Sequence, residues 1–339
     1  TDIYEKPQAS LVVLKQEIVS KQIKYYQISY TPRSISLDEI VDETRELLIS
    51  SLQIRMRSDV PIAFCLSGGV DSTALASIAS KKLGKDIHAF TIIDKDDRYD
   101  ETENVRTTIK HLGCEHHIAR TSTDGFFERL QKLVDYHDSP VSTISYYVHS
   151  YLSEEIANRG FKVALSGTGA DEIFTGYYDH YSFWLAQMYS DEDFPDFLND
   201  WQTSFGKYVR NPILKDPLVF KKNPSERRHI YADNNYFNQM LTYPITETFS
   251  EKTYSKDILR NRMLNELFHE VVPVILHEDD LNSMCWSVEN RSPYLDSKLV
   301  KHLFSVPSQD LIKKGFKVTL IDRDEPCLLY TSPSPRDRG

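Results

Sequence analysis

Four short strand-like runs, each followed by a helical pattern, constrain this 339-residue chain more than any other feature. They lie at 61–67, 86–93, 114–121 and 161–167. The first of them is continuously apolar, which is typical of a strand buried on both faces of a sheet. Helices between successive strands favour βαβ units. The sequence therefore predicts an α/β fold in which a parallel sheet is flanked by helices.

The segments around these strands show other patterns. Residues 177–250 are rich in aromatic side chains, and the chain after Gly176 is expected to be mostly helical. The further expected elements are short β runs at 11–14 and 23–30 and helices at 37–57, 73–84, 100–113, 124–136, 145–159, 255–277 and 279–289. The C-terminal part is thus predicted to be a helical addition to the sheet.

Composition excludes several classes of protein. The formal net charge of -10 disfavours a protein that grips nucleic acid through its phosphates. No run of apolar residues is long enough for a transmembrane helix, and the N-terminus lacks a signal-peptide pattern. The four cysteines show no CxxC spacing, so neither a zinc site nor a disulfide framework is predicted from them. We expect a reduced, cytoplasmic protein.

The turn after the first strand reads SGGVDS at 67–72. Gly68 and Gly69 allow the backbone to approach a phosphate closely and to turn its N–H groups toward it. The N-terminus of the following helix adds partial positive charge. Asp71 would repel a bare phosphate, so its place in this turn indicates a Mg²⁺ ligand. The alternative is an ordinary strand-to-helix turn with an Asp near the N-cap.

A second glycine-rich turn follows the fourth strand and reads SGTGADEIFTGY at 166–177. In a parallel sheet both turns lie at the carboxyl ends of strands, where ligands bind. We therefore expect Asp171 to meet Asp71 across one Mg²⁺-pyrophosphate. An N-capping Asp beside a glycine turn is the alternative here.

A third segment, 278–296, joins a polar helix end to the pattern E-x-R-x-P-x-L-D. Asn282, Glu289 and Arg291 are its candidates for the substrate side of a site. The alternative is that Glu289 and Arg291 form a structural ion pair and that Pro293 is a turn residue.

Taken in order, the three segments resemble the synthetase domain of glutamine-dependent asparagine synthetases, within the ATP-pyrophosphatase superfamily. The segment HDSP at 137–140 resembles the H-D-E-P of some family members. The resemblance covers about 36–320 and implies an adenine-nucleotide-alpha-hydrolase-like (HUP) fold. On this basis 1–35 are expected to be the end of a glutaminase domain and a linker, 36–325 a truncated synthetase domain, and 326–339 a non-native or disordered tail.

The resemblance also implies roles for individual residues. ATP binding is implied for Leu66, Ser67, Gly68, Gly69, Asp71, Ser72, Ile92, Ser166 and Gly167. Mg²⁺ ligation is implied for Asp71 and Asp171, and a catalytic position for Asp171, Thr168 and Lys317. The implied reaction is adenylation of the aspartate side-chain carboxylate by ATP, followed by amidation with ammonia from glutamine. Positioning and charge neutralisation by Mg²⁺ would carry the catalysis.

The sequence departs from the family pattern at three positions. Thr168 stands where typical asparagine synthetases carry Glu, and a hydroxyl cannot replace a carboxylate as a charge or base. Ser139 replaces another Glu, and Lys317 lies one residue earlier than the family lysine. A related enzyme that amidates another carboxylate, a different ATP pyrophosphatase and a non-catalytic nucleotide-binding homologue therefore stay open.

The expected partners are small molecules: ATP, aspartate, and ammonia or glutamine, with ATP and Mg²⁺ as cofactors. Neither nucleic acid nor membrane is expected, and a homodimer is allowed.

Overall fold

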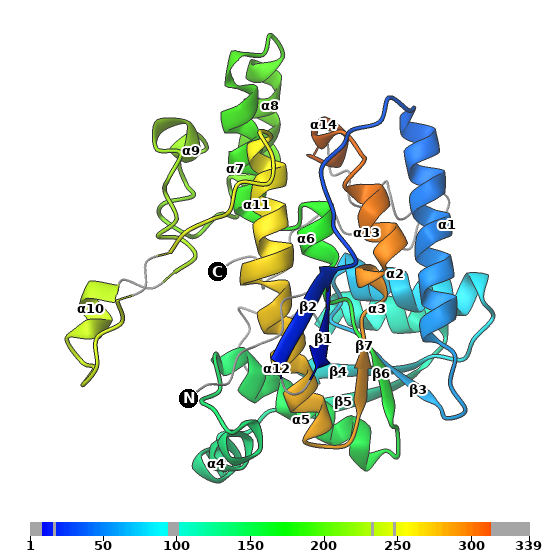
Figure 1. The fold of residues 1–339 in the computed structure, drawn as a ribbon. Coiled ribbons are helices and arrows are strands. Elements are labelled where there is room, and N and C mark those ends of the chain that lie inside the picture. Colours follow the sequence, from blue (N-terminus) through cyan, green and yellow to red (C-terminus); the bar gives the residue numbers. More distant parts are fainter. Residues whose placement is uncertain (1–8, 16–17, 94–101, 232–233, 247–248, 313–339) are drawn as a thin grey trace.

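A central sheet of five parallel strands organises the protein (Figure 1). The computed structural model describes residues 9–15, 18–93, 102–231, 234–246 and 249–312. The strand order is β5-β4-β3-β6-β7. The strands are β3 (Ile62–Cys65), β4 (His88–Ile93), β5 (Glu115–Arg120), β6 (Val163–Leu165) and β7 (Glu289–Arg291). The predicted α/β fold with a parallel sheet is confirmed, and each of the four predicted strands is present.

The direction of the chain across the sheet reverses between β3 and β6. From β3 the chain proceeds outward through β4 to β5, and it then returns to the other side of β3 as β6. Phe64 of β3 is paired with Leu165 of β6, so the two strands end side by side. Ligands of open α/β sheets bind at such a reversal, beyond the carboxyl ends of the strands.

Helices cover both faces of the sheet. α5 contacts β4 and β5 and packs against α12, while α2 contacts β3 and α3 contacts β4. Successive residues of each strand face two different apolar cores. Phe64 and Leu165 belong to one core, and Ala63 and Ala164 belong to the other. The helices of this part are α1 (Leu37–Arg55), α2 (Val70–Ser77), the π-helix η1 (Ile78–Lys82), α3 (Thr102–Leu112), α4 (Phe126–His137), α5 (Ile144–Asn158) and α6 (Ala170–Phe174). Burial on both faces explains the apolar runs in the sequence.

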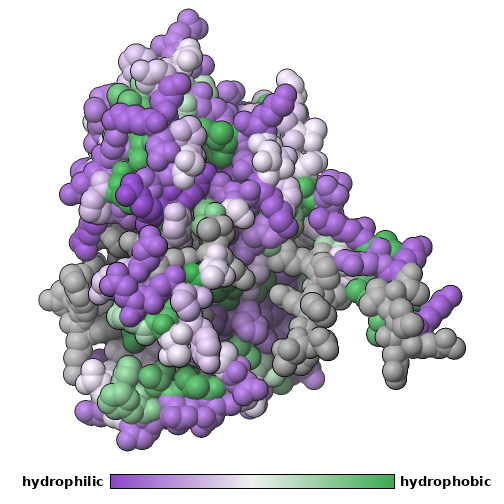
Figure 2. All heavy atoms as spheres, turned by 60° about the vertical axis from the view of Figure 1, so that its left-hand side comes forward, coloured by the Kyte–Doolittle hydropathy of each residue, from purple (hydrophilic) through white to green (hydrophobic). Residues whose placement is uncertain are grey.

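The C-terminal half adds helices, as predicted. α7 packs against α9 and α11. The elements are α7 (Tyr178–Gln187), η3 (Met188–Ser190), α8 (Phe194–Asp200), η4 (Trp201–Phe205), α9 (Val219–Lys222), α10 (Asn234–Asn238), α11 (Ile258–Asn265), η5 (Glu266–Glu270), α12 (Val272–Met284), η6 (Pro293–Leu295), α13 (Ser297–Leu303) and α14 (Ser308–Ile312). Figure 2 shows a mostly hydrophilic face with smaller apolar groups among the charged side chains.

The structure breaks the helices expected at 255–277 and 279–289 at other residues than the sequence predicted. α11 ends at Asn265, a π-helix follows, and α12 runs from Val272 to Met284. Pro273 lies in the first turn of α12, where its missing N–H is tolerated; inside a longer helix it would remove a hydrogen bond. The expected second helix is wrong beyond Met284, because 289–291 form the edge strand β7, paired with β6.

The N-terminal hairpin pairs β1 (Ser10–Lys15) with β2 (Ile18–Lys24) in antiparallel fashion. The second β run was expected at 23–30, and this placement is wrong. The segment after Lys24 is hydrogen-bonded to the C-terminal helices. The Tyr26 hydroxyl donates to the Ser297 carbonyl at 2.9 Å, and the Arg33 N–H donates to the Ser305 carbonyl at 2.8 Å. Residues 26–33 therefore lie along α13 rather than extending the hairpin.

A buried ion network connects α7, α11 and η5. Arg262 is 2% exposed; its Nε lies 3.1 Å from Glu266 and its Nη1 lies 2.9 Å from Glu251. Glu266 in turn lies 2.7 Å from His180, which is fully buried. Burial disfavours the charged form of His180, but the Glu266 carboxylate outweighs this and raises the His180 pKa. The acids of this region are thus neutralised within the chain.

We predict that Arg262→Met lowers the free energy of unfolding by roughly 3–5 kcal/mol, because it leaves buried carboxylates without their cation. The matched control is Arg159→Met, which removes only an exposed pair with Glu155; its expected cost is below about 1 kcal/mol. Urea-unfolding curves at neutral pH would measure both. Equal losses for the two variants would contradict the role assigned to Arg262.

Candidate active site

The first glycine-rich loop is fastened to β4 and to its own helix. The Leu66 N–H donates to the Phe90 carbonyl, and the Thr91 hydroxyl donates to the Leu66 carbonyl, both at 2.8 Å. Within the loop the Ser67 N–H donates to the Ser72 hydroxyl at 3.1 Å. These bonds close residues 67–72 into a compact turn directly beyond β3.

Glycine is required inside this turn. Gly68 has a φ of 81°, which side-chain-bearing residues rarely adopt. Gly69 is the N-cap of α2 and offers no side chain to cap it. The start of α2 is therefore open to an anion approaching its backbone N–H groups.

The second loop lies against the first. A Cβ on Gly167 would be 3.2 Å from the Cβ of Asp71 and 3.3 Å from the N of Ser72. The N–H of Ser166 donates to the Arg291 carbonyl at 3.1 Å, which holds this loop to β7. The two predicted phosphate loops thus form one continuous surface at the reversal of the sheet.

The two predicted Mg²⁺ ligands lie near the same phenol. The Tyr294 hydroxyl donates to the Asp71 carbonyl at 3.0 Å. Burial raises the Tyr294 pKa well above its usual value, and the carboxylates of Asp71 and Asp171 raise it further. Asp171 also packs on Gly176, where a Cβ would lie 1.7 Å from its Oδ1. Two carboxylates from separate loops fit a hard, oxygen-liganded cation such as Mg²⁺.

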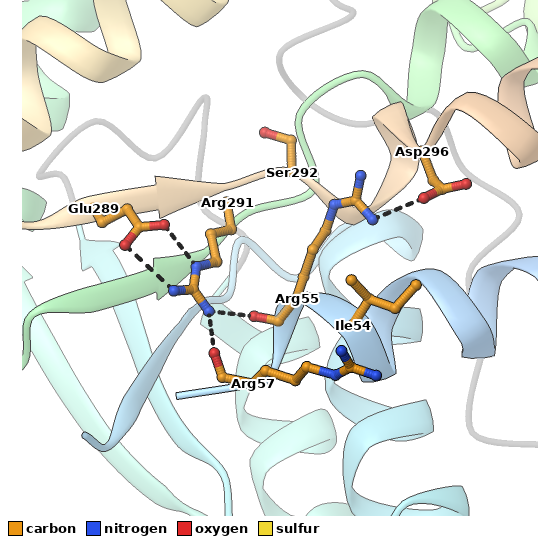
Figure 3. A pocket seen from close by; sticks show the side chains of 7 residues that line it. All are labelled: Ile54, Arg55, Arg57, Glu289, Arg291, Ser292 and Asp296. Atoms are coloured by element: carbon orange, nitrogen blue, oxygen red, sulfur yellow. Dashed lines mark hydrogen bonds and ion pairs between the residues drawn. The ribbon is translucent and has the colours of Figure 1, made fainter. Parts of the chain in front are cut away.

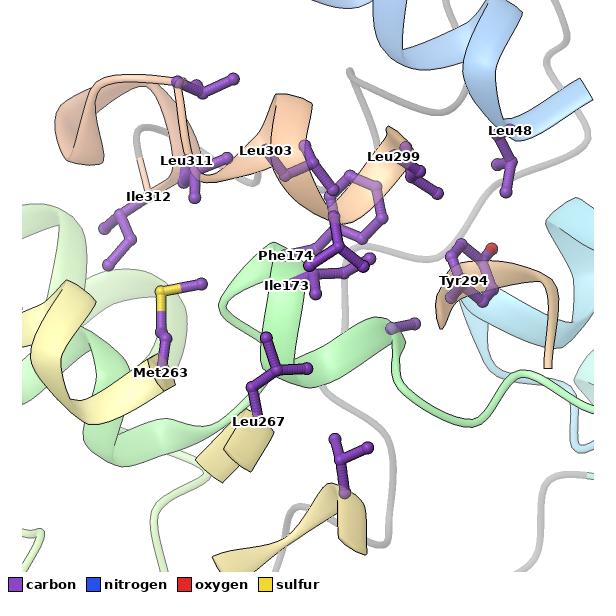
Figure 4. Packing of buried hydrophobic residues seen from close by; sticks show 14 of the residues in the cluster. Leu48, Ile173, Phe174, Met263, Leu267, Tyr294, Leu299, Leu303, Leu311 and Ile312 are labelled. Atoms are coloured by element: carbon purple, nitrogen blue, oxygen red, sulfur yellow. The ribbon is translucent and has the colours of Figure 1, made fainter. Parts of the chain in front are cut away.

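The helix that carries Asp171 is short but firmly held. α6 has five residues, and its Ile173 and Phe174 are buried. Figure 4 shows these two side chains between α13 on one side and η5 on the other. Phe174 meets the Tyr294 ring edge-on, with centroids 5.9 Å apart. This packing fixes the second loop without a long helix behind it.

Beside Asp171, Glu172 is 1% exposed and accepts a hydrogen bond from the Tyr177 hydroxyl at 2.6 Å. Burial, and then the Asp171 carboxylate, raise the pKa of Glu172 to about 7. Glu172 therefore carries a reduced negative charge at neutral pH.

Two further predicted ATP contacts lie at strand ends. Leu66 is 2% exposed and follows β3, and Ile92 is half-buried near the end of β4. Both sit at the carboxyl edge of the sheet, on the side of the loops. Lys317 lies outside the described residues.

The substrate-side candidates have structural contacts. Asn282 is buried, and its Nδ2 donates to the Tyr146 carbonyl at 2.8 Å, which joins α12 to α5. Glu289 and Arg291 form an ion pair at 2.8 Å. Arg291 also donates to the carbonyls of Arg55 and Arg57 at 2.7 and 2.9 Å. These contacts fit the structural ion pair considered for Glu289 and Arg291, and they give Asn282 a structural contact as well.

The Glu289–Arg291 pair borders an open hollow of about 470 Å³ at the end of α1 (Figure 3). Its lining is Ile54, Arg55, Arg57, Glu289, Arg291, Ser292 and Asp296. Arg291 points toward the carbonyls at the end of α1. None of the lining residues belongs to either glycine-rich loop, and the hollow adjoins the second loop only through Arg291, whose carbonyl accepts the Ser166 N–H.

One residue beside the loops escaped the sequence analysis. The Thr168 hydroxyl donates to Oδ2 of Asp279 at 3.1 Å and accepts from the Ser166 hydroxyl at 3.0 Å. Asp279 comes from α12 and lies 3.9 Å from His149 Nδ1. A carboxylate is therefore present where Thr168 itself supplies none. The only sequence signal was that Asp279 and Asn282 fall three residues apart, on one face of a helix.

The parallel sheet, with helices on both faces and two glycine-rich loops at its reversal, fits a HUP-like α/β fold. A family model described as asparagine synthase matches residues 43–320. The chain belongs to the asparagine synthase family.

Individual relatives agree with this assignment. Asparagine synthetase [glutamine-hydrolyzing] 1 of Bacillus subtilis is 31% identical over 86% of this chain and 48% of its own length. A putative asparagine synthetase of Methanocaldococcus jannaschii is 27% identical over 71% of this chain and 44% of its own length. A protein of Gibberella zeae named amidase chry2 is 23% identical over 90% of this chain and 52% of its own length. The chain spans about half the length of these relatives.

Among the described residues, the structure contains no helix of the length and apolar character needed to cross a bilayer.

We predict that Gly176→Ala weakens Mg²⁺-ATP binding at least about tenfold, because the new methyl group displaces the Asp171 carboxylate. Isothermal titration with Mg²⁺-ATP would measure the change. If Gly176→Ala acts through Asp171, adding it to Asp171→Ala should cost nothing further. An additional loss in the double variant would show that Gly176 matters for another reason.

Proposed function

We propose that this chain carries the synthetase reaction of an asparagine-synthetase-type ligase. In this reaction the side-chain carboxylate of aspartate attacks the α-phosphorus of ATP, and pyrophosphate leaves. Ammonia, derived from glutamine, then attacks the acyl carbon of the adenylate, and AMP leaves with a proton lost from nitrogen. The observation that supports it best is the contact of the two loops at the reversal of a parallel sheet, with Asp71 and Asp171 beside it. Residues 36–325 would form this synthetase domain, and 1–35 the end of a preceding domain with its linker.

The residues of the loops suit the first half of this reaction. The backbone of 67–72 and the start of α2 offer N–H donors for the pyrophosphate, with hydroxyl groups from Ser67 and Ser72. Mg²⁺, held by Asp71 and Asp171, would neutralise the charge of the departing pyrophosphate. Leu66 and Ile92 would contact the adenine. Ser166 and Gly167 would also contact the nucleotide. The chain then contributes mainly positioning, which suits the activation of a poor acylating agent.

The second half of the reaction needs a group that accepts a proton from the attacking ammonia. Thr168 cannot serve as that base. We propose that Asp279, whose carboxylate accepts the Thr168 hydroxyl hydrogen bond, supplies the negative charge at this position. Thr168 would position Asp279 toward the acyl carbon.

A second candidate is an amidotransferase that acts on a carboxylate other than that of aspartate. Thr168 in place of the family Glu favours it, and two relatives, from Gibberella zeae and Penicillium rubens, bear amidase names. Both candidates share the ATP half of the chemistry and differ in the carboxylate that is activated.

Pyrophosphate release from Mg²⁺-ATP, with aspartate and ammonium as substrates, tests the proposal. We expect release that depends on aspartate and falls by about 100-fold or more in Asp71→Asn, because the loss of a metal ligand costs several kcal/mol. Release with another carboxylate but not with aspartate would establish the second candidate. Tight ATP binding without any release would identify a non-catalytic homologue, and a stable complex with tRNA would point to a different ATP pyrophosphatase.

Asp279→Asn tests the position beside Thr168. We predict that it lowers asparagine formation by roughly 100-fold, as expected for loss of a general base, while binding of Mg²⁺-ATP stays unchanged. The neighbouring Asp280 is exposed, so Asp280→Asn is the matched control and should leave activity intact. Equal activity of Asp279→Asn and the control would exclude a catalytic role for Asp279.

A further inference from the structure

We propose that His88, Glu115 and His117 form a binding site for a transition-metal ion, with Zn²⁺ the best match. His88 Nδ1 lies 3.0 Å from Glu115 Oε2, and His117 Nε2 lies 3.3 Å from Glu115 Oε1. One ligand atom from each residue falls within 4.8 Å of the others. This cluster plays no part in the proposed ligase reaction.

The sheet itself brings the three side chains together. His88 opens β4 and is paired directly with Glu115, the first residue of β5. His117 follows two residues after Glu115, so it points from the same face of the sheet. Cys114 and His116 fall on the opposite face by the same alternation. The three donors are therefore placed by paired backbone rather than by a loop, which suits a preorganised site.

The buried histidine supplies an independent observation. The His117 side chain is 8% exposed, and its Nε2 has no hydrogen-bond partner among the described residues, although Glu115 is near. Buried polar atoms without a partner are uncommon and call for an explanation. Phe90 and Phe161 pack around this ring, with centroids 4.6 and 6.3 Å away, and fix its direction. A metal ion between the two imidazoles and the carboxylate would satisfy this nitrogen.

The donor set identifies the class of ligand. Two imidazoles and one carboxylate suit Zn²⁺ and neighbouring first-row ions, whereas Mg²⁺ and Ca²⁺ prefer oxygen ligands. In a tetrahedral zinc site with bonds of about 2.0–2.1 Å, ligand atoms lie roughly 3.4 Å apart. Here His88 lies 3.0 Å from one oxygen of Glu115, to which it is hydrogen-bonded, and His117 lies 3.3 Å from the other oxygen, so modest side-chain shifts would reach that spacing. The side chains of His88 and Glu115 are 30% and 59% exposed, so an ion can enter from solvent.

A second cluster of this kind among the described residues has a different environment. Asp179, His180 and Glu266 also bring ligand atoms together, but all three are buried. The Arg262 guanidinium lies 3.6 Å from Asp179 and 3.1 Å from Glu266, in the position that a cation would need. Around His88, Glu115 and His117, the structure shows no such arginine or lysine contact among the described residues.

The proposed metal site lies far along the strands from the proposed ATP site. His88 begins β4, while Ile92 lies near its end, and the glycine-rich loops follow the carboxyl ends of β3 and β6. A bound ion would join the edge strand β5 to its neighbour β4 at their amino ends. We therefore expect the ion to stabilise the sheet without entering the ligase chemistry.

Titration of tag-free protein with ZnCl₂ in excess Mg²⁺ tests the site, since the Mg²⁺ keeps Zn²⁺ from the loop carboxylates. We expect one saturable site that persists in Asp71→Asn and raises the melting temperature. Loss of a residue that only hydrogen-bonds to a metal ligand typically weakens metal binding by roughly 10- to 100-fold. His88→Ala and Glu115→Gln remove ligands themselves, so each should weaken Zn²⁺ binding by more than that. His111→Ala, at an exposed histidine outside the cluster, is the matched control.

Substitution with Co²⁺ provides a second readout, because tetrahedral Co²⁺ with nitrogen ligands absorbs visible light. The bands should appear in the wild type and in His111→Ala and be absent in His88→Ala. Glu115→Gln changes an exposed side chain and leaves the fold intact, and circular dichroism would check that His88→Ala, at a half-buried position, is also folded. The proposal is overturned if the wild type shows no saturable site, or if the two variants bind Zn²⁺ as tightly as the control.

Discussion

The parallel pairing of β3 with β6 is the constraint on which the rest of the molecule depends. It places the ends of two strands that are 100 residues apart in the chain side by side, with Phe64 opposite Leu165. Each strand then runs into a glycine-rich loop, and a Cβ on Gly167 would lie only 3.2 Å from the Cβ of Asp71, a contact tighter than side chains usually make. A larger residue at this position would push against the first loop. Gly167 thus serves the approach of one loop to the other.

Sequence patterns predicted this part of the fold because each strand–loop–helix unit is local. The apolar runs mark strands buried on both faces, and glycine with a following helix marks the turns. β7 was missed because its three residues, Glu289–Arg291, are polar and gain strand geometry only from β6. Pro273 marks the start of α12, but the sequence does not show that a π-helix, η5, precedes it. The break between the two helices was therefore expected at other residues than those the structure shows.

The candidate site was predicted where a motif is contiguous and missed where it is assembled from distant segments. The 67–72 and 166–171 loops fall together as expected, whereas Asp279 meets Thr168 across 111 residues of chain. No local spacing encodes that contact, since α12 must first pack on α5 to bring Asp279 near the loop. For Glu289 and Arg291 the structure shows structural contacts, while their assignment to the substrate side stays a prediction. Arg291 holds the end of α1 through two carbonyls, a role that sequence cannot distinguish from substrate binding.

The distribution of charge explains how an acidic chain can present a site for an anionic nucleotide. Behind the second loop, Glu266 and Asp179 are matched by Arg262 and His180, so their charges are balanced inside the protein. Glu172, next in line, has a pKa raised to about 7 by burial and by Asp171, and it therefore holds part of its proton at neutral pH. Negative charge at the reversal of the sheet is then concentrated on the loop carboxylates. A divalent cation would reverse the sign of the potential there, and the polyphosphate would meet the cation and the N–H groups of the loop rather than the bare acids.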